Sequence, residues 1–270
     1  MARPFNSMEL INPTLLTPGR VATLREEFAT AQPYKHVVLD NFLRPEVAEG
    51  LTKNFPPYER FNKKYKGLNE YKAEGSNFED FDPSFARLRD EIKSADFCRW
   101  LSEVTGIEEL YSVEDALGAG LHQGGDGSFL DVHIDFNIHV DRNIHRRINL
   151  LIYFNKDWKE AYGGGTELWN ADMTVCEKTV EPLFNRCLIF ETNEISYHGY
   201  DKIRLPEGVT RKSFYAYYYT DLRKDAAKYH DTVFKARPSD SRTKKLVTPV
   251  KEQIKNFVKA RLKDFGFKLS

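Results

Sequence analysis

The sequence predicts a mostly β protein: a double-stranded β-helix, or jelly roll, flanked by N-terminal helices and a C-terminal helix. Beyond about residue 110, short apolar segments alternate with polar turns and with glycine clusters such as 163–165, as expected for consecutive strands and hairpins. Helix-like spacing of apolar residues occurs before and after this region. The predicted strands suit two packed sheets and cover 117–122, 128–137, 147–154, 166–170, 179–183, 186–191, 195–200 and 212–220.

Residues 1–110 are expected to form a helical and α+β support that packs on a double-stranded β-helix core of residues 111–221. Thr17 and Pro18 begin a helical pattern, because Thr at the cap and Pro in the first turn favour helix initiation. Residues 36–40 have the apolar character of a short buried strand. The predicted helices are 18–31, 45–51, 85–93 and 95–104, and the last of these has one apolar face.

The segment 56–83 is polar and aromatic, with repeated Asn, Gly and Lys, and has no evident secondary-structure pattern. Structureless segments of this length are usually functional or mobile. We expect either a lid that closes over a substrate or an ordinary surface excursion, and the sequence favours neither.

Residues 222–270 are expected to form a C-terminal helical extension. A linker at 236–244 precedes the segment 250–262, in which Val250, Ile254, Phe257, Val258 and Leu262 form one apolar stripe with Lys and Arg opposite. A basic amphipathic helix can lie on a membrane, but a single stripe is more often packed on its own domain or on a dimer partner. A homodimer through this helix is therefore one expectation.

The composition indicates a globular protein with one substantial core. The 270 residues include 41% hydrophobic ones, and 40 basic residues balance 40 acidic ones, so no net field attracts nucleic acid or an anionic membrane. Three cysteines without a Cys-x-x-Cys pair argue against a disulfide framework and against structural zinc. Residues 1–16 lack the apolar core of a signal peptide, and no run of membrane-spanning length follows. We expect a cytoplasmic protein.

His133 and Asp135 form half of a possible metal site. Side chains at i and i+2 leave the same face of a strand, so this imidazole and this carboxylate lie side by side in the predicted strand 128–137. A non-haem Fe(II) centre needs two His and one carboxylate on one face of an octahedron, with the other positions open. One further His is required.

His198 is the best-placed third ligand among the remaining histidines. It follows the apolar run 187–190, and a separate strand can bring it back to the pair. His139 shares a face with His133, but six strand residues separate them by roughly 20 Å. Apart from the distant His36, the others are His122, His145 in a probable turn, and His230, and the sequence context supports none of them.

Arg211 and Ser213 lie thirteen and fifteen residues beyond His198, at the start of an aromatic run. A guanidinium with a nearby hydroxyl is a clamp for a carboxylate. A His-x-Asp pair, a distal His and then Arg-x-Ser resemble the iron(II)- and 2-oxoglutarate-dependent oxygenases, and the prolyl-4-hydroxylase-like branch is the most similar. The resemblance covers about residues 115–221, and it implies a jelly-roll fold. Prolyl 4-hydroxylases commonly have Lys where this chain has Arg211.

The resemblance also implies cofactors and roles. His133, Asp135 and His198 would hold Fe(II), O2 and 2-oxoglutarate would take the open positions, and Arg211 with Ser213 would bind the far carboxylate of 2-oxoglutarate. Decarboxylation to succinate would accompany hydroxylation of a small molecule or a peptidyl residue. Alternation along the strands predicts further cavity walls: Tyr153 and Leu151 near 2-oxoglutarate, and Gln123, Asn137 and Asn149 near the substrate.

Two alternatives differ in kind. One is a non-enzymatic cupin-like jelly roll that binds a ligand, in which the histidines are structural. The other is an oxygenase of the same superfamily with a different oxidative outcome, such as halogenation, desaturation or cyclisation. Halogenases typically replace the carboxylate with Gly or Ala to admit chloride, and Asp135 is present here. The sequence leaves the substrate open among a prolyl residue, a free amino acid, a saccharide and a natural product.

Overall fold

The computed structural model describes residues 5, 7–223, 227–249 and 251–252. Its α-helices are α1 (Pro18–Thr30), α2 (Pro45–Lys53), α3 (Pro83–Lys93) and α4 (Ala95–Thr105), and its 3-10 helices are η1 (Pro13–Leu16), η2 (Tyr58–Arg60), η3 (Phe78–Asp80) and η4 (Glu160–Tyr162). Its strands are β1 (His36–Leu39), β2 (Lys63–Lys66), β3 (Glu70–Gly75), β4 (Ala119–Gly124), β5 (Phe129–Ile134), β6 (Ile144–Tyr153), β7 (Thr166–Trp169), β8 (Cys176–Val180), β9 (Arg186–Glu191), β10 (His198–Tyr200), β11 (Arg211–Asp221) and β12 (Val233–Phe234).

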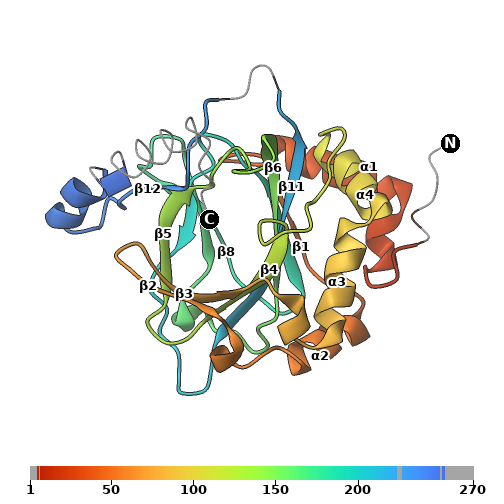
Figure 1. Ribbon diagram of the computed structural model, residues 1–270, viewed down its shortest axis with the longest axis horizontal. Coiled ribbons are helices and arrows are strands. Elements are labelled where there is room, and N and C mark those ends of the chain that lie inside the picture. Colours follow the sequence, from red (N-terminus) through yellow and green to blue (C-terminus); the bar gives the residue numbers. More distant parts are fainter. Residues whose placement is uncertain (1–4, 6, 224–226, 250, 253–270) are drawn as a thin grey trace.

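The strands form one antiparallel sheet that bends into a nearly closed barrel (Figure 1). Its order is β1-β9-β6-β11-β4-β3-β5-β10-β7-β8, with β12 on β5 and β2 on β3. In this order, one wall of the barrel consists of β1, β9, β6, β11 and β4, and the facing wall consists of β5, β10, β7 and β8. This is the predicted jelly roll, and each strand predicted between 117 and 220 overlaps an observed one.

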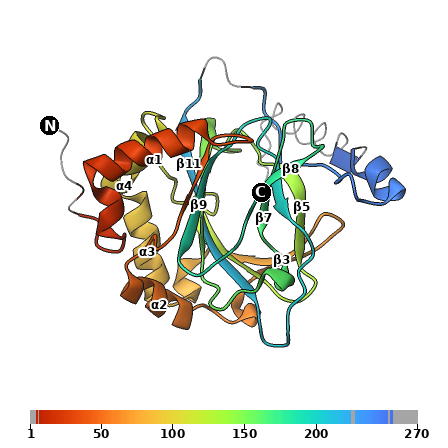
Figure 2. The ribbon, with the colours of Figure 1, turned by 180° about the vertical axis from the view of Figure 1, so that it is seen from behind.

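The four α-helices cover the outer face of the wall that contains β9, β6 and β11 (Figure 2). The hydroxyl of Thr17 accepts a hydrogen bond from Arg20 N at 3.4 Å and caps α1, and the hydroxyl of Ser94 caps α4 in the same way through Phe97 N at 3.2 Å. Gly106, at φ 70°, ends α4 in the left-handed conformation that glycine adopts without strain. The four predicted helices are confirmed within a few residues at their ends.

Alternation along β6 and β11 separates two environments. Because successive strand side chains point to opposite faces, one set packs on the helices and the other faces the barrel interior. The helix-facing set belongs to the large hydrophobic core and consists of Ile148, Leu150, Ile152, Phe214, Ala216 and Tyr218. The interior set, which includes Asn149, Leu151, Arg211 and Ser213, lines a cavity.

The prediction that 56–83 lacks secondary structure was wrong. This segment contains the hairpin β2–β3, and β3 pairs with both β4 and β5. It therefore joins the two walls of the barrel. The strand sequences KKYK and EYKAEG lack the apolar alternation by which half-buried strands are recognised, because Lys, Glu and Tyr fill most positions and the two buried ones hold only Ala73 and Gly75.

The chain after β11 returns to β5. Arg237 Nη1 and Lys244 Nζ both contact Asp131 Oδ1, at 3.1 and 2.8 Å, and attach this return segment to β5. Residues 242–249 are helical, so a helix begins inside the predicted linker 236–244. The amphipathic helix predicted at 250–262, with its dimer contact, lies outside the described residues except for 251 and 252. Within the described part of the chain, no helix has the length and apolarity needed to cross a bilayer.

Candidate metal centre and its cavity

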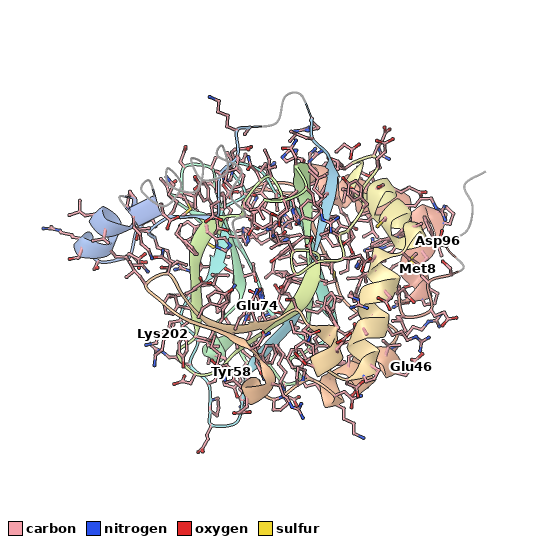
Figure 3. The ribbon with its side chains drawn as sticks, in the orientation of Figure 1. Met8, Glu46, Tyr58, Glu74, Asp96 and Lys202 are labelled. Carbon is pink, nitrogen blue, oxygen red and sulfur yellow. The ribbon has the colours of Figure 1, made fainter. Side chains whose placement is uncertain are left out.

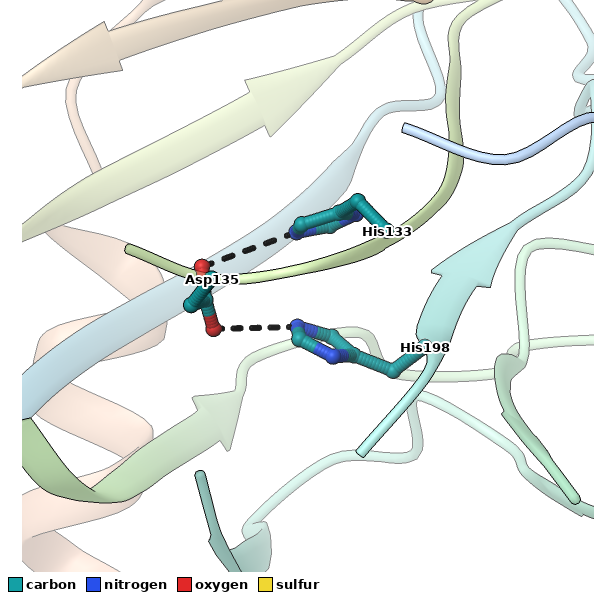
Figure 4. Close-up of side chains that lie close together, drawn as sticks. All are labelled: His133, Asp135 and His198. Carbon is teal, nitrogen blue, oxygen red and sulfur yellow. Dashed lines mark ion pairs between the residues drawn. The ribbon is translucent and has the colours of Figure 1, made fainter. Parts of the chain in front are cut away.

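His133, Asp135 and His198 converge on one point inside the barrel (Figure 4). β5 and β10 are antiparallel neighbours in which His198 stands directly opposite His133, so the ladder brings together two residues that are 65 positions apart in sequence. His133 Nε2 lies 3.6 Å from Asp135 Oδ1, and His198 Nε2 lies 3.4 Å from Asp135 Oδ2. One ligand atom from each residue lies within 4.8 Å of the others, as a shared ion requires.

Both imidazoles are oriented by backbone carbonyls. His133 Nδ1 donates to Asp131 O at 2.9 Å, and His198 Nδ1 donates to Ser196 O at 2.9 Å. A proton held on Nδ1 leaves the Nε2 lone pair facing the convergence point, as at protein metal sites. Burial, with the neighbouring His133, lowers the pKa of His198 to about 4. The ring is therefore neutral at pH 7 and able to bind a metal.

Asp135 is also held by two groups other than the histidines. Its Oδ2 accepts a hydrogen bond from Asn149 Nδ2 at 2.7 Å and lies 3.2 Å from Arg146 Nη2. Burial alone would raise the pKa of Asp135, but the charge of Arg146 and the neighbouring His198 outweigh it and hold the pKa well below its ordinary value. The carboxylate is ionised, so two imidazoles and one anion form a donor set that fits Fe(II).

A cavity of about 470 Å³ contains this donor set. Among the predicted wall residues, Asn149, Leu151, Arg211 and Ser213 line it together with the three proposed ligands. Tyr153 stands opposite Ser213 and so faces the barrel interior, but it does not line the cavity; its hydroxyl is 2.8 Å from that of Thr166 and its ring lies 5.3 Å from the Arg211 guanidinium.

Arg211 is a buried cation in the wall of this cavity. Its Nε donates to Gly164 O at 2.8 Å, its Nη2 donates to the Thr166 hydroxyl at 3.2 Å, and its guanidinium lies 4.3 Å from the centre of the Tyr200 ring. None of these partners is a carboxylate, and no ion pair of Arg211 is found among the described residues. Since an unpaired buried charge is costly, this guanidinium fits an anionic group of a bound molecule.

Two predicted wall residues were placed wrongly. Gln123 is not at the cavity, because its strand neighbour His122 stands opposite Ser213 in the β4–β11 ladder and shares its inward face; Gln123 points to the other face and bonds to the Thr210 hydroxyl at 2.9 Å. β5 ends at Ile134, so strand alternation does not extend to Asn137. The Asn137 amide binds backbone atoms of 227–230 instead.

The other histidines divide as follows. His139 is not at the metal centre, as predicted, and contacts Asp115 at 3.1 Å; it lies beyond the end of β5 and not on the same strand as His133. His145 lies in β6 and is buried, so the turn predicted there was wrong. His122 does line the cavity, and its ring stacks on Tyr215 at 4.4 Å. Its sequence context, between Leu121 and Gln123, gave no signal of this role.

A polar network on the inner face of β3, β4 and β11 was also missed from the sequence. The carboxylate of Glu74, which Figure 3 shows inside the barrel, lies 3.3 Å from His122 Nε2, 3.2 Å from the Tyr215 hydroxyl and 3.8 Å from Lys72 Nζ. Burial lowers the pKa of His122 to about 4. The network depends on β3, which had no strand signal, so spacing alone could not reveal it.

The fold and donor set define a class of protein. A jelly roll with two histidines and one carboxylate around an open cavity is a scaffold for a non-haem iron centre with free coordination positions. Residues 119–219 match the model of the 2OG-Fe(II) oxygenase superfamily, and no curated protein matches the sequence. The core of this chain is therefore similar to the 2OG-Fe(II) oxygenase superfamily, whose members use Fe(II), 2-oxoglutarate and O2, and its two histidines and one aspartate are compatible with that iron. The predicted resemblance and cofactors are confirmed at this level.

Solved structures support the same fold. A prolyl-4-hydroxylase from Pseudomonas putida is 15% identical, with a TM-score of 0.51 over 74% of this chain and 98% of its own. A prolyl hydroxylase from Trichoplax adhaerens, solved with a hypoxia inducible factor peptide fragment, is 17% identical, with a TM-score of 0.52 over 74% and 88%. A prolyl 4-hydroxylase from Phytophthora capsici is 13% identical, with a TM-score of 0.52 over 97% and 76%. Such identities establish the fold and leave the substrate open.

Proposed function

We propose that this chain is an Fe(II)- and 2-oxoglutarate-dependent dioxygenase that hydroxylates an unactivated C–H bond of a small molecule or of an amino-acid or prolyl residue, releasing succinate and CO2. The observation that carries the proposal is the pairing, in one cavity, of an Fe(II) donor set with the buried Arg211, which lacks a carboxylate partner among the described residues. A cytoplasmic location is part of the same proposal, because an odd number of cysteines without Cys-x-x-Cys fits a reducing compartment.

The protein's own part in the reaction is binding and shielding. Bound iron with 2-oxoglutarate and O2 supplies the oxidising chemistry. His133, Asp135 and His198 hold the metal, while Arg211 and Ser213 bind the far carboxylate of 2-oxoglutarate. Gly164 keeps Arg211 aimed by accepting its Nε–H, and a Cβ at this glycine would lie 2.5 Å from Ile203 Cγ2. Leu151 gives the cavity an apolar wall that limits the entry of water.

We propose a polar substrate of modest size. After 2-oxoglutarate is accommodated, part of a cavity of about 470 Å³ is left, and the network of Lys72, Glu74, His122 and Tyr215 provides hydrogen-bonding groups on its wall. Hydroxylation is favoured over halogenation because Asp135 occupies the position that chloride would need.

The β2–β3 hairpin is the proposed cover of this site. Tyr65 and Leu68 line the cavity from the hairpin, and Leu68 is 45% exposed. Replacing Leu68 with Asp should leave 2-oxoglutarate binding intact while uncoupling succinate formation from substrate oxidation, because the metal centre is then less shielded from water. Full coupling in Leu68→Asp would contradict a covering role.

The decisive experiment is a mass-spectrometric screen of the iron-loaded chain with 2-oxoglutarate, O2 and a panel of amino acids, prolyl peptides, saccharides and natural products. We expect one class to couple succinate formation to a mass gain of one oxygen, and His198→Ala to abolish both signals. A chlorinated product in chloride buffer would refute hydroxylation. Ligand binding without metal or 2-oxoglutarate dependence would favour the non-enzymatic ligand-binding jelly roll.

A further inference from the structure

Arg146 is a buried cation directly behind the carboxylate of the proposed metal site. Its side chain is 1% exposed, and its guanidinium lies 3.5 Å from the centre of the Tyr217 ring and 4.5 Å from that of Phe136. Asp135 is its only carboxylate partner among the described residues, at 3.2 Å. The sequence gave Arg146 no role beyond following His145 in a supposed turn.

Arg146, Asn149 and Asp135 form a closed triangle of polar contacts. Arg146 Nε and Nη2 both donate to Asn149 Oδ1, at 3.0 and 2.5 Å, which turns the Asn149 amide nitrogen toward Asp135 Oδ2 at 2.7 Å. Oδ2 therefore accepts a hydrogen bond from Asn149 and forms an ion pair with Arg146, while Oδ1 faces His133 at 3.6 Å. The orientation of the carboxylate is fixed by neighbours that are not themselves metal ligands.

A break in the strand register aims Arg146 inward. Along the β6–β11 ladder, Tyr218 pairs with Ile148, but Tyr219 pairs with Arg146, so Arg147 is an extra residue in β6. Without this bulge, Arg147 would stand opposite Tyr219. Instead Arg147 contacts Glu191 at 3.2 Å, and Arg146 faces the barrel. Bulges of this kind redirect side chains beside active sites.

Stability alone gives little reason to keep such a pair. Desolvation of two charges offsets much of their attraction, and replacing buried ion pairs by apolar residues is often neutral or stabilising. The polar contacts of Arg146 lead to Asp135 Oδ2 both directly and through Asn149. Its charge is thus placed where it acts on the metal carboxylate.

We propose that Arg146, through Asn149, positions the metal carboxylate and makes the metal site one charge more positive than two histidines and one aspartate would. This inference rests on the proposed function, since it assumes that iron occupies the triad. A nearby positive charge disfavours the ferric state relative to the ferrous state, because it repels the higher charge more strongly. It also attracts the dianionic 2-oxoglutarate.

The first test measures the Fe(III)/Fe(II) midpoint potential of the full chain by mediated spectroelectrochemistry. Arg146→Gln should lower the potential, Arg146→Lys should stay closer to wild type because it keeps the charge, and Arg147→Gln should match wild type as a neighbouring buried arginine that faces Glu191. A folded Arg146→Gln protein with the wild-type potential would overturn the proposal.

A second test does not depend on the folding of Arg146→Gln. In Asp135→Gly, Arg146 and Asn149 would be left facing a space the size of a carboxylate, so added formate should improve Mn(II) affinity by about tenfold or more, which is the effect of about 1.4 kcal/mol. Asn149→Leu in the Asp135→Gly background should remove this rescue. Failure of formate to rescue Asp135→Gly would overturn the proposal.

The two proposals fail separately. A wild-type chain that binds iron but forms no succinate with any substrate would count against the dioxygenase proposal. The measurements of midpoint potential and of formate rescue need bound metal but do not depend on catalytic turnover. They would therefore still test the role of Arg146.

Discussion

Replacing Arg211 with Ala should weaken 2-oxoglutarate binding far more than metal binding. Arg211 is 6% exposed, and its guanidinium is oriented by Gly164 O and the Thr166 hydroxyl. Its removal leaves a space near Tyr153 and Tyr200 in which the far carboxylate of 2-oxoglutarate would have no cationic partner.

The size of the effect follows from this burial. A hydrogen bond to a charged group contributes about 1.5–3 kcal/mol, and removing one partner of a buried ion pair costs about 3–5 kcal/mol. Where these ranges meet, about 3 kcal/mol corresponds to a Kd increase of roughly a hundredfold, and about tenfold is the lower limit. Arg211→Lys should fall between Ala and wild type, because Lys keeps the charge without the planar fork.

Anaerobic titration of 2-oxoglutarate into Mn(II)-loaded protein measures this directly, with Mn(II) affinity determined in parallel. Arg204→Ala is the matched control, since Arg204 is exposed and does not line the cavity. A wild-type Kd for 2-oxoglutarate in Arg211→Ala would place the carboxylate clamp elsewhere and refute the assignment.

Three further outcomes are expected. His198→Ala should lose Mn(II) binding in equilibrium titration while His139→Ala retains it, and the reverse result would mean that the third ligand is wrongly assigned. Gly199→Ala should also weaken the metal, because a Cβ there would lie 2.7 Å from Leu130 O and would push β10 away from β5; unchanged affinity would show that the ladder tolerates this shift. Burial lowers the pKa of His122 from 6.5 to about 4, so the unfolded chain takes up this proton first as pH falls. The free energy of unfolding should then decrease between about pH 6.5 and 4, by up to about 1.4 kcal/mol per pH unit for this group. Denaturant titrations at several pH values should show that the free energy of unfolding of His122→Gln falls less steeply with pH.

The sequence predicted the parts of the fold that have a regular apolar period. Strands such as β6 and β9, with one face on the helices, could be recognised from their apolar content. The His-x-Asp pair lies side by side as predicted, although β5 ends at Ile134, one residue before Asp135. Predictions from alternation failed where pairing with a neighbouring strand decides which side chains face the cavity. Gln123 was chosen over His122 because the register against Ser213 is a tertiary property, and the bulge at Arg147 has no signal in sequence.

The hairpin β2–β3 could not be predicted for a different reason. Its residues are stabilised as strands by pairing with β4 and β5, which lie some fifty residues further along the chain. Charged side chains such as Lys72 and Glu74 find their partners only in the folded barrel, so local propensity carries no trace of them.

The pairing of His133 with His198 gives a metal ion a second role as a removable cross-link. An ion held from both sides would join β5 to β10, a strand only three residues long, and a ligand that binds only the folded ladder stabilises it by mass action. Amide hydrogens of β10 should therefore exchange faster after chelation, while those of β9 and β11 in the helix-covered wall change little. The time for which β10 stays paired with β5 would determine how long the ion is retained. Metal release and amide hydrogen exchange in β10 would then report the same local opening of the barrel.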